Sequence, residues 1–340
     1  MNKTLEALRI VADAKRDLSV KESSDVFDEI MSGAVDSDIL AAFLTALKMK
    51  GECVNEIVGA AIAMRSKASF INSGGTSPVD TCGTGGDGLN TINISTTAAF
   101  IIAGAGVAVA KHGNRAASSK SGSADVLAAL GFNLDVESAV MEHCLQECGI
   151  AFLFAPKMHP AMRFAGPVRK KLGFRTIFNV LGPLLNPAGT RAQIVGVFDT
   201  YHTEVLANSL KILGSKSAMV FHSADGMDEI SPCTLTRISE LKNGRVTTRE
   251  FNPCDYFDTV ENFDALRGGD AAFNASRTLD IIENRDRSSA ADACLLNAAA
   301  GIYVGGKAAD FPSAMELARE SLRSGAAREK LEQLVAFSKK

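Results

Sequence analysis

Apolar residues recur at helical spacing through the first 70 residues of the chain. The opening segment, MNKTLEALRIVADAKRDLSV, has the mixed charges of an amphipathic helix, and three short helices are predicted after it. The first of these opens with Ser19 and Glu22 at the spacing of a capping box, and the second opens at Asp36 or Ser37 and closes at Gly51. Short helices joined by short turns predict a compact α-helical domain at this end of the chain.

The pattern changes after residues 72–78, NSGGTSP, which break the helical periodicity and predict a domain boundary. Beyond this segment, short apolar strands alternate with helices, and Asn243-Gly244 lies between two β-rich runs as in a hairpin. Near-continuous apolar strands between helices predict an α/β domain whose sheet is mostly parallel and covered on both faces. The predicted strands are 79–82, 107–111, 150–154, 193–198 and 218–222, and the predicted helices are 95–103, 123–130, 136–148, 159–172, 203–213 and a tail from about 289.

Composition narrows the class of protein. The net charge of −3 argues against a broad nucleic-acid or anionic-membrane surface, and the longest apolar run, 98–110, is shorter than the roughly 20 residues of a membrane span. The N-terminus lacks the apolar core of a signal peptide. Seven scattered cysteines form no C-x-x-C pair, which favours reduced thiols. We therefore expect a soluble cytoplasmic protein with neither a membrane nor a nucleic-acid partner.

A glycine-rich stretch, Gly83-Thr84-Gly85-Gly86-Asp87-Gly88, follows the first predicted strand. It satisfies the dinucleotide fingerprint G-x-G-x-x-G, but no acidic residue follows until Asp125, so the ribose-binding acid of that motif is missing. A lysine at Walker spacing is also missing. A purely structural turn is the plainer alternative. However, amides and hydroxyls follow at a helix start, which favours binding of phosphate or pyrophosphate.

A second polar segment, Lys111-His112-Gly113-Asn114-Arg115, emerges from a buried strand, where open α/β sheets place their ligand sites. A lone lysine is usually a solvated charge, and a lone histidine is often only packed. Here two bases, an amide and a glycine leave the strand together, and 118–123, SSKSGS, leads into another helix start. Taken with the glycine stretch, these residues predict an anion-binding pocket.

Asp228-Glu229 forms an adjacent carboxylate pair between a buried strand and Pro232. An exposed acidic turn is the alternative explanation. Mg²⁺ prefers oxygen ligands and commonly shares one or two protein carboxylates with substrate phosphates. If the glycine stretch binds pyrophosphate, this pair is the expected metal site.

A basic stretch lies between His159 and Arg175. Most of its charges are expected to face solvent, but one arginine pointing inward could hold a carboxylate in a bidentate fork. No Ser-His-Asp or Cys-His arrangement has a recognisable context, so neither a covalent nucleophile nor a strong catalytic base is predicted.

These motifs together resemble the anthranilate phosphoribosyltransferase family over nearly the whole chain. The matching segments are GTGGDG at 83–88, NTINIST at 90–96, KHGNR at 111–115, SSKSGSADVL at 118–127, FLFAPKMHPAM at 152–162, RTIFNVLGPLLNP at 175–187 and DEIS at 228–231. The resemblance implies the nucleoside phosphorylase/phosphoribosyltransferase class of fold, with a small α-helical domain (1–72, joined by part of 165–190) and a large α/β domain (73–340). It also implies a homodimer formed through the helical domain.

The resemblance implies an activity as well. Phosphoribose would pass from 5-phosphoribosyl 1-pyrophosphate to the amine of anthranilate, giving N-(5-phosphoribosyl)anthranilate and pyrophosphate, the second step from chorismate to tryptophan. Mg²⁺ would be required, with two ions per subunit. The residues implied for the pyrophosphate substrate are Gly83, Thr84, Gly85, Gly86, Asp87, Thr91, Asn93, Ser95, Thr96, Lys111, Ser119 and Ser123. Those implied for anthranilate are Gly83, His112, Asn114, His159, Arg169 and Gly182, and those for the metal are Ser95, Asp228 and Glu229.

Two other functions remain open at this point. A pyrimidine nucleoside phosphorylase would share the architecture and bind phosphate and a nucleoside, but has no evident need for Asp228-Glu229. A non-catalytic relative that binds nucleic acid would be expected to have a basic surface and degraded KHGN and DEIS motifs, unlike this chain.

Overall fold

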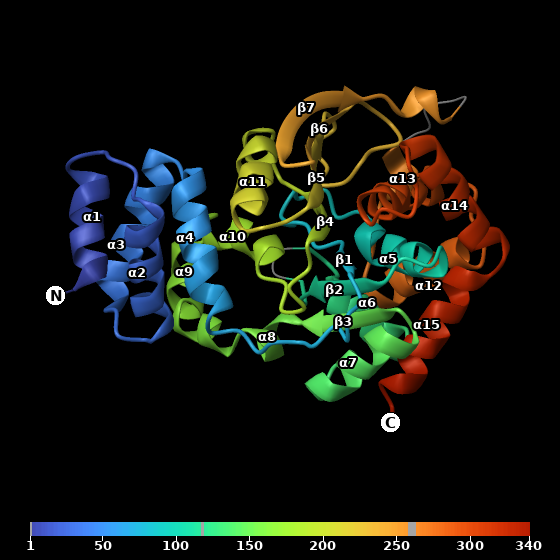
Figure 1. Ribbon diagram of the computed structural model, residues 1–340, viewed down its shortest axis with the longest axis horizontal. Helices are drawn as coiled ribbons and strands as arrows, with labels where there is room; N and C mark the ends of the chain where they lie inside the picture. The colour runs from blue at the N-terminus through green and yellow to red at the C-terminus, as the bar shows by residue number, and fades with distance from the viewer. Residues whose placement is uncertain (1, 117–118, 258–262) are drawn as a thin grey trace.

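The computed structural model describes residues 2–116, 119–257 and 263–340. Its N-terminal part is a bundle of the helices α1 (Lys3–Ala12), α2 (Val20–Met31), α3 (Ser37–Lys50) and α4 (Val54–Arg65), at the left of Figure 1. The predicted capping box is confirmed, because the Ser19 side chain accepts from the Glu22 amide and the Glu22 carboxylate accepts from the Ser19 amide. Asp36 caps α3 without a capping box, by accepting hydrogen bonds from the amides of Asp38 and Ile39.

A seven-stranded sheet with the order β3-β2-β1-β4-β5-β6-β7 forms the second part of the molecule. The strands β1 to β5 pair in parallel, while β6 and β7 form an antiparallel hairpin at one edge. This arrangement confirms the predicted fold class of a small helical domain and a mostly parallel α/β domain. The strands are β1 (Val79–Asp80), β2 (Val109–Gly113), β3 (Ile150–Phe154), β4 (Ala192–Gly196), β5 (Ser217–Ser223), β6 (Thr236–Lys242) and β7 (Arg245–Phe251).

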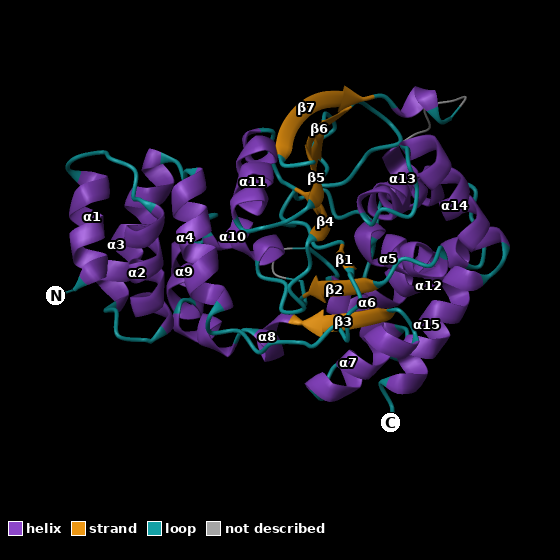
Figure 2. Cartoon of the chain, viewed as in Figure 1, coloured by secondary structure: helices purple, strands orange, loops and turns teal. Residues whose placement is uncertain are grey.

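Helices cover both faces of the sheet (Figure 2). On one side lie α5 (Ile94–Gly104), α6 (Ser123–Ala129), α7 (Ser138–Glu147), α12 (Ala271–Ile282), α13 (Ser289–Val304), α14 (Phe311–Arg323) and α15 (Ala326–Phe337). On the other side α11 (Tyr201–Ile212) packs on β5 and β6 and contacts α4 of the bundle. Successive residues of β4 therefore face different clusters: Ile194 packs in the cluster around α5 and α13, and Val195 in the cluster shared with the bundle.

The prediction of one helix over 159–172 is wrong. The chain forms α8 (Ala155–Met158), a 3-10 turn (Pro160–Phe164) and then α9 (Gly166–Leu172). Pro160 and Pro167 explain the breaks, because proline lacks the amide hydrogen that a helix interior needs and is tolerated only in a first turn. The structure also contains three helices that were not predicted, α8, α10 (Phe178–Leu181) and α12.

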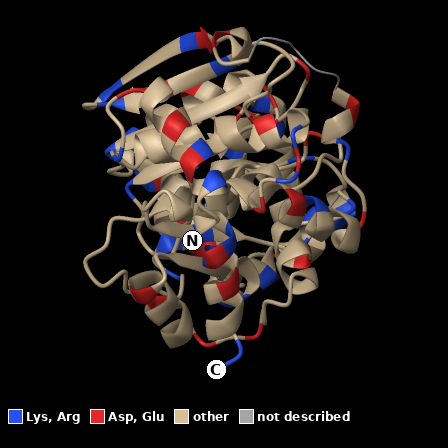
Figure 3. Ribbon diagram, turned by 90° about the vertical axis from the view of Figure 1, so that its right-hand side faces the viewer, with Lys and Arg blue, Asp and Glu red and all other residues tan. Residues whose placement is uncertain are grey.

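Residues 165–185 contribute to the same hydrophobic cluster as the bundle. Ala165, Val168, Phe178 and Leu181 are buried together with α2, α3 and α4, and the Phe178 ring meets Phe27 edge-on at 5.5 Å. Acidic and basic residues are interspersed along the ribbon (Figure 3) rather than divided into an acidic and a basic half. None of the described helices combines the length and the apolar character that crossing a bilayer requires.

Candidate functional site

The glycine loop, residues 83–88, connects β1 to α5 at the carboxyl end of the sheet. It begins against β4, where the Thr84 amide donates to the Gly196 carbonyl at 2.8 Å. Gly85, Gly86 and Gly88 have φ values of 64°, 83° and 80°, a region that disfavours residues with a Cβ. The glycines are therefore needed for the path of the loop, which leaves backbone amides near the start of α5.

Lys111 lies within β2, and its side chain points to the start of α5. Its ammonium donates to the Thr81 carbonyl at 3.2 Å, the Thr81 hydroxyl at 2.9 Å and the Ser95 hydroxyl at 3.3 Å. The side chain is buried, and this desolvation lowers the pKa of Lys111. Lys111 is thus a buried cation at a helix N-terminus that is free of acids in its first turn.

Asp228 and Glu229 lie against the same two segments. Glu229 Oε1 accepts from the Ser95 amide at 3.1 Å, and a Cβ built on Gly83 would lie 3.3 Å from Asp228 Oδ2. Burial, followed by repulsion from Asp87, raises the pKa of Asp228 to about 7, and burial with repulsion from Asp228 raises the pKa of Glu229 well above its usual range. Neighbouring carboxylates with raised pKa values are a donor set that a hard divalent cation would stabilise, so these residues fit Mg²⁺.

The loop that carries Asp228 and Glu229 is held by contacts with α13, β5 and β4. Asn297 of α13 accepts from the Ile230 amide at 3.1 Å and donates to the Ile230 carbonyl at 3.1 Å. The Ser223 hydroxyl donates to the Glu229 carbonyl at 2.5 Å. A Cβ on Gly196 would lie only 1.5 Å from the Asp228 carbonyl oxygen, so β4 packs directly on the loop. The two carboxylates are therefore held by rigid elements.

His112, His159 and Gly182 form a second group beside Lys111. The two imidazole rings meet edge-on at 5.0 Å, and His112 Nδ1 lies 3.2 Å from the Gly182 carbonyl. Burial lowers the pKa of His112 to about 3 and that of His159 to about 4, so both rings are neutral at pH 7. The Nε2 atoms of both rings are buried and have no hydrogen-bond partner within the described chain.

Arg169 is the inward-pointing arginine of the basic stretch. Its guanidinium lies over the Phe178 ring, 5.3 Å from the centroid, and burial lowers its pKa. No acidic side chain of the described residues pairs with it. Arg163, Lys170, Lys171 and Arg175 are exposed. A half-buried guanidinium without a protein carboxylate is suited to an anionic ligand.

Of the remaining predicted residues, some contact the segments around Lys111 and others do not. Asn93 donates to the Ser121 carbonyl at 3.2 Å, and the Ser123 hydroxyl donates to the Asn114 carbonyl at 3.2 Å, which joins α5 and α6 to the segment after β2. Thr96 is buried within α5, while Ser119 is exposed. Thr91 is bridged to Arg267, without a hydrogen bond to the Lys111 group in the described structure. Ser118, in the SSKSGS segment, lies outside the described residues.

The sequence analysis did not identify four residues that support the site: Asp80 and Thr81, just before the glycine loop, and Asn274 and Asn297, far from it in sequence. Asp80 Oδ1 accepts from the amides of Cys82 and His112, both at 3.1 Å, and Thr81 holds Lys111. Asn274 donates to Asn93 at 2.8 Å. Asn297 is a polar residue inside the apolar run of α13, and a buried polar residue requires hydrogen-bond partners, so this position could have been identified from the sequence.

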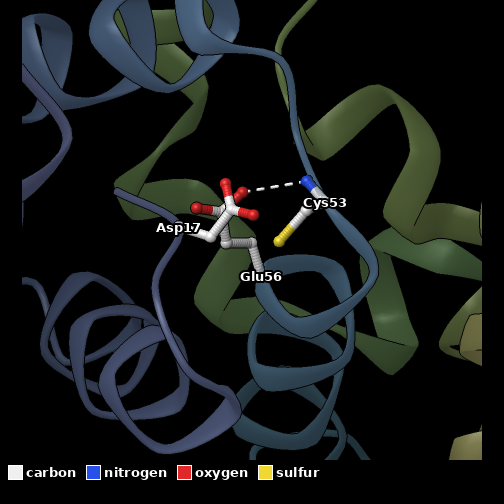
Figure 4. A group of neighbouring side chains, drawn as sticks. All are labelled: Asp17, Cys53 and Glu56. Atoms are coloured by element: carbon white, nitrogen blue, oxygen red, sulfur yellow. Dashed lines mark hydrogen bonds between the residues drawn. The ribbon is translucent and has the colours of Figure 1, made fainter. Parts of the chain in front are cut away.

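A separate acidic group lies in the helical bundle. Ligand atoms of Asp17, Cys53 and Glu56 lie within 4.8 Å of one another (Figure 4). Lys50 already neutralises it, with 2.5 Å to Asp17 and 3.1 Å to Glu56, and Glu56 also accepts from the amides of Leu18 and Cys53. Burial opposes the charge of Lys50, but its hydrogen bonds to both carboxylates raise its pKa overall. We interpret this group as a satisfied ion-pair network.

Known families match both parts of the chain. A glycosyl transferase family model for the helical bundle domain matches residues 5–68, and one for the a/b domain matches residues 75–328. The anthranilate phosphoribosyltransferase of Desulfosudis oleivorans is 48% identical over 96% of both chains, and that of Desulfatibacillum aliphaticivorans is 50% identical over 95% of both.

Solved structures agree with the sequence relatives. The anthranilate phosphoribosyltransferase of Thermus thermophilus superposes with a TM-score of 0.93, at 38% identity and full coverage of both chains. That of Saccharomyces cerevisiae, in complex with PRPP and Mg, superposes with a TM-score of 0.90 at 25% identity, over 99% of this chain and 98% of the other. The family predicted from the motifs is thus confirmed: the chain belongs to the anthranilate phosphoribosyltransferase family.

Proposed function

We propose that this chain is an enzyme that transfers phosphoribose from 5-phosphoribosyl 1-pyrophosphate to the amine of anthranilate, releasing pyrophosphate, in the second step from chorismate to tryptophan. The observation that carries the proposal is the convergence of Lys111, Ser95 and Glu229 beside the glycine loop. Relatives that bear this activity in their names match nearly the full length of the chain. No observation favours a nucleoside phosphorylase or a nucleic-acid-binding protein.

The pyrophosphate substrate binds at the glycine loop and the N-terminus of α5. Displacement at C1 of the ribose builds negative charge on the leaving pyrophosphate, and fixed donors stabilise that charge without reorganising. Loop amides, Lys111 and the Ser95 hydroxyl supply these donors, and Asn93, Ser119 and the α6 terminus at Ser123 extend the site. Thr81 accepts two hydrogen bonds from the Lys111 ammonium, so the protein itself fixes the position of this cation.

Asp228, Glu229 and Ser95 hold magnesium, with two ions per subunit. The metal supplies further neutralisation of the pyrophosphate charge. The residues of the chain orient it: the Ser95 amide fixes Glu229, and Asn297 fixes the backbone next to the pair.

Anthranilate binds on the side of His112, His159 and Gly182, with Asn114 at the edge and its carboxylate on Arg169. The aromatic amine is neutral near pH 7, so no strong base is needed, and alignment with C1 is the main requirement. Because burial keeps His112 and His159 neutral, they present aromatic surface without adding charge beside Lys111.

The direct test mixes purified protein with anthranilate, 5-phosphoribosyl 1-pyrophosphate and Mg²⁺ and follows the loss of anthranilate fluorescence. Phosphorolysis of uridine serves as the rival reaction. Arg169→Gln should raise KM for anthranilate about tenfold or more, with KM for the pyrophosphate substrate unchanged, while Lys170→Gln, an exposed neighbour, should change neither. Activity on uridine and none on anthranilate would refute the proposal.

The enzyme works as a cytoplasmic homodimer that associates through its helical domain. Support comes from apolar side chains left exposed on and beside the bundle, where Met49 is 84%, Ile62 44% and Phe70 72% exposed. Light scattering coupled to size-exclusion chromatography should give twice the chain mass, and a Met49→Glu variant that remained dimeric would place Met49 outside the interface.

A further inference from the structure

We infer that Arg175 is a positioning residue that sets the conformation of the glycine loop and thereby the affinity for the pyrophosphate substrate. Arg175 lies in the connector between α9 and α10, far from the loop in sequence, and it is not among the residues predicted for either substrate. Its Nη2 atom donates a hydrogen bond to the Gly86 carbonyl. A Cβ built on Gly86 would lie 3.7 Å from Arg175 Nε, so the guanidinium covers this part of the loop.

The middle of the glycine loop needs such support. The start of the loop is fixed by the Thr84 amide on the Gly196 carbonyl at 2.8 Å, and the chain after the loop is fixed by the Ile92 amide on the Leu266 carbonyl at 2.9 Å. Between these two contacts lie glycines with left-handed φ values, whose backbone has the most conformations available to it. On either side of Gly86, the Gly85 backbone donates to the Asp228 carboxylate and the Leu89 amide donates to Asp87 Oδ1 at 3.1 Å. The hydrogen bond from Arg175 is made to the Gly86 carbonyl between them.

Arg175 is itself held in place by an aromatic ring. Its guanidinium lies over Phe198, 4.3 Å from the ring centroid, and Phe198 packs against His202 at 5.0 Å. Stacking on a ring orients the planar guanidinium and reduces the entropy lost when it donates. The charged group therefore sits in a defined orientation although the side chain is exposed.

The planarity of the peptide links this contact to substrate binding. The carbonyl of Gly86 and the amide of Asp87 belong to one trans peptide unit and point in opposite directions. When Arg175 fixes the carbonyl, the Asp87 amide is turned away from Arg175 and held there. The inference rests on the proposed function in one respect, that the loop amides bind the pyrophosphate group.

Two measurements test this role, and one of them does not depend on activity. Endoproteinase Asp-N cuts before aspartate, so it cleaves the Gly86–Asp87 bond, the peptide that Arg175 holds. In native protein without ligands, Arg175→Ala should increase the rate of cleavage at this bond about tenfold, as mass spectrometry of the fragments would measure. In the activity assay, KM for the pyrophosphate substrate should rise about tenfold, while kcat and KM for anthranilate stay within about threefold.

Three further variants separate positioning from charge and from folding. Phe198→Leu retains the arginine but removes the ring beneath it, so both effects should appear with the same sign and smaller size. Arg175→Lys retains the charge and should restore neither measurement fully, because the ammonium lacks the planar fork. Arg163→Ala, an exposed arginine that also lies over a ring, that of Phe164 at 4.8 Å, should behave as wild type in both.

Unchanged cleavage in Arg175→Ala, or full rescue of KM by Arg175→Lys, would overturn the inference. If the wild type has no activity on anthranilate, the proposed function fails, and the cleavage measurement still decides whether Arg175 holds the loop.

Discussion

Two groups of buried or half-buried charges in this molecule are built on opposite principles. In the helical bundle, Glu56 accepts hydrogen bonds from two amides and from Lys50, so its charge is fully compensated. In the loop after β5, Asp228 and Glu229 are adjacent, and burial raises both pKa values, with further repulsion from Asp87 on Asp228 and from Asp228 on Glu229. Both groups are rich in carboxylates, so composition does not tell them apart. The presence or absence of hydrogen-bond and ion-pair partners for each charge does distinguish a structural charge cluster from a binding site.

The largest test of this contrast removes the uncompensated charges. Asp228→Asn with Glu229→Gln should lower Mg²⁺-dependent kcat/KM about 10³-fold or more, because the metal and its leaving-group stabilisation are lost. Stability at pH 8 should be equal or higher, since the repulsion between buried carboxylates disappears. Steady-state kinetics and urea unfolding of one preparation check both parts, and near-normal turnover would exclude the pair from catalysis.

Removal of the compensated charge should have the reverse effect. Glu56→Ala leaves the Leu18 and Cys53 amides without an acceptor and should lower the free energy of unfolding by about 3 kcal/mol. The kcat of the folded enzyme should stay within twofold, as the bundle contributes no predicted substrate residue. Glu56→Gln keeps a side-chain oxygen that can accept from one of the two amides, so it is the matched control and should lose less. A loss of activity without a loss of stability would contradict the structural role.

The two regions should also lose stability in different pH windows. The folded-state pKa values of His112 and His159 are lowered by burial, so below pH 6.5 the unfolded chain binds protons that the folded chain does not. The stability that each histidine contributes is therefore complete above pH 6.5 and should fall by about 1.4 kcal/mol per pH unit below it, down to about pH 4. The raised pKa values of Asp228 and Glu229 act in the opposite direction in this window. Glu22, whose pKa is lowered to about 2 mainly by its hydrogen bond from Arg16, contributes stability above pH 4.5 that is lost as the pH falls through about 2.

Urea midpoints measured between pH 7 and 5 separate these windows. A His112→Asn, His159→Asn double variant should lose the rise in stability with pH that the two histidines supply in this range, whereas Glu22→Gln should leave the slope unchanged. A double variant whose slope between pH 6.5 and 5 equals that of the wild type would contradict the buried neutral histidines.

The smallest expected effect is at the edge of the bundle. Ser19→Ala removes the cap whose hydroxyl accepts from the Glu22 amide at 3.2 Å and should cost about 1 kcal/mol in unfolding free energy, with activity unchanged. Ser19→Thr, which retains the hydroxyl, should recover most of the loss in the same thermal or urea measurement.

Local signals predicted much of the fold. The Ser19–Glu22 capping box, the Asn243-Gly244 hairpin and the strand 150–154 follow from short-range chemistry and were found where predicted. The helix over 159–172 was wrong because two prolines outweighed its apolar periodicity. The first strand is only two residues long, and Thr81, the residue after it, accepts a hydrogen bond from Lys111.

The site was predictable to the extent that its residues lie in motifs. Lys111, Ser95 and Glu229 are brought together across more than 100 residues of sequence, as the resemblance implied. Their partners could not be inferred in the same way. Asn297 and Asn274 act through contacts that only the packing of α12 and α13 creates, and such contacts have no fixed sequence spacing. The roles of the individual site residues stay predictions until they are measured.

The pair of hydrogen bonds between Asn297 and the Ile230 backbone has a practical consequence for protein engineering. Two hydrogen bonds join Asn297 of α13 to the Ile230 backbone, next to the carboxylate pair. Truncating or exchanging the C-terminal region would therefore disturb the site. Chimaeras between family members should transfer α13 and the 225–231 loop together. Variant libraries that change only one of these two segments should mostly yield proteins in which the contact between Asn297 and Ile230 is disrupted.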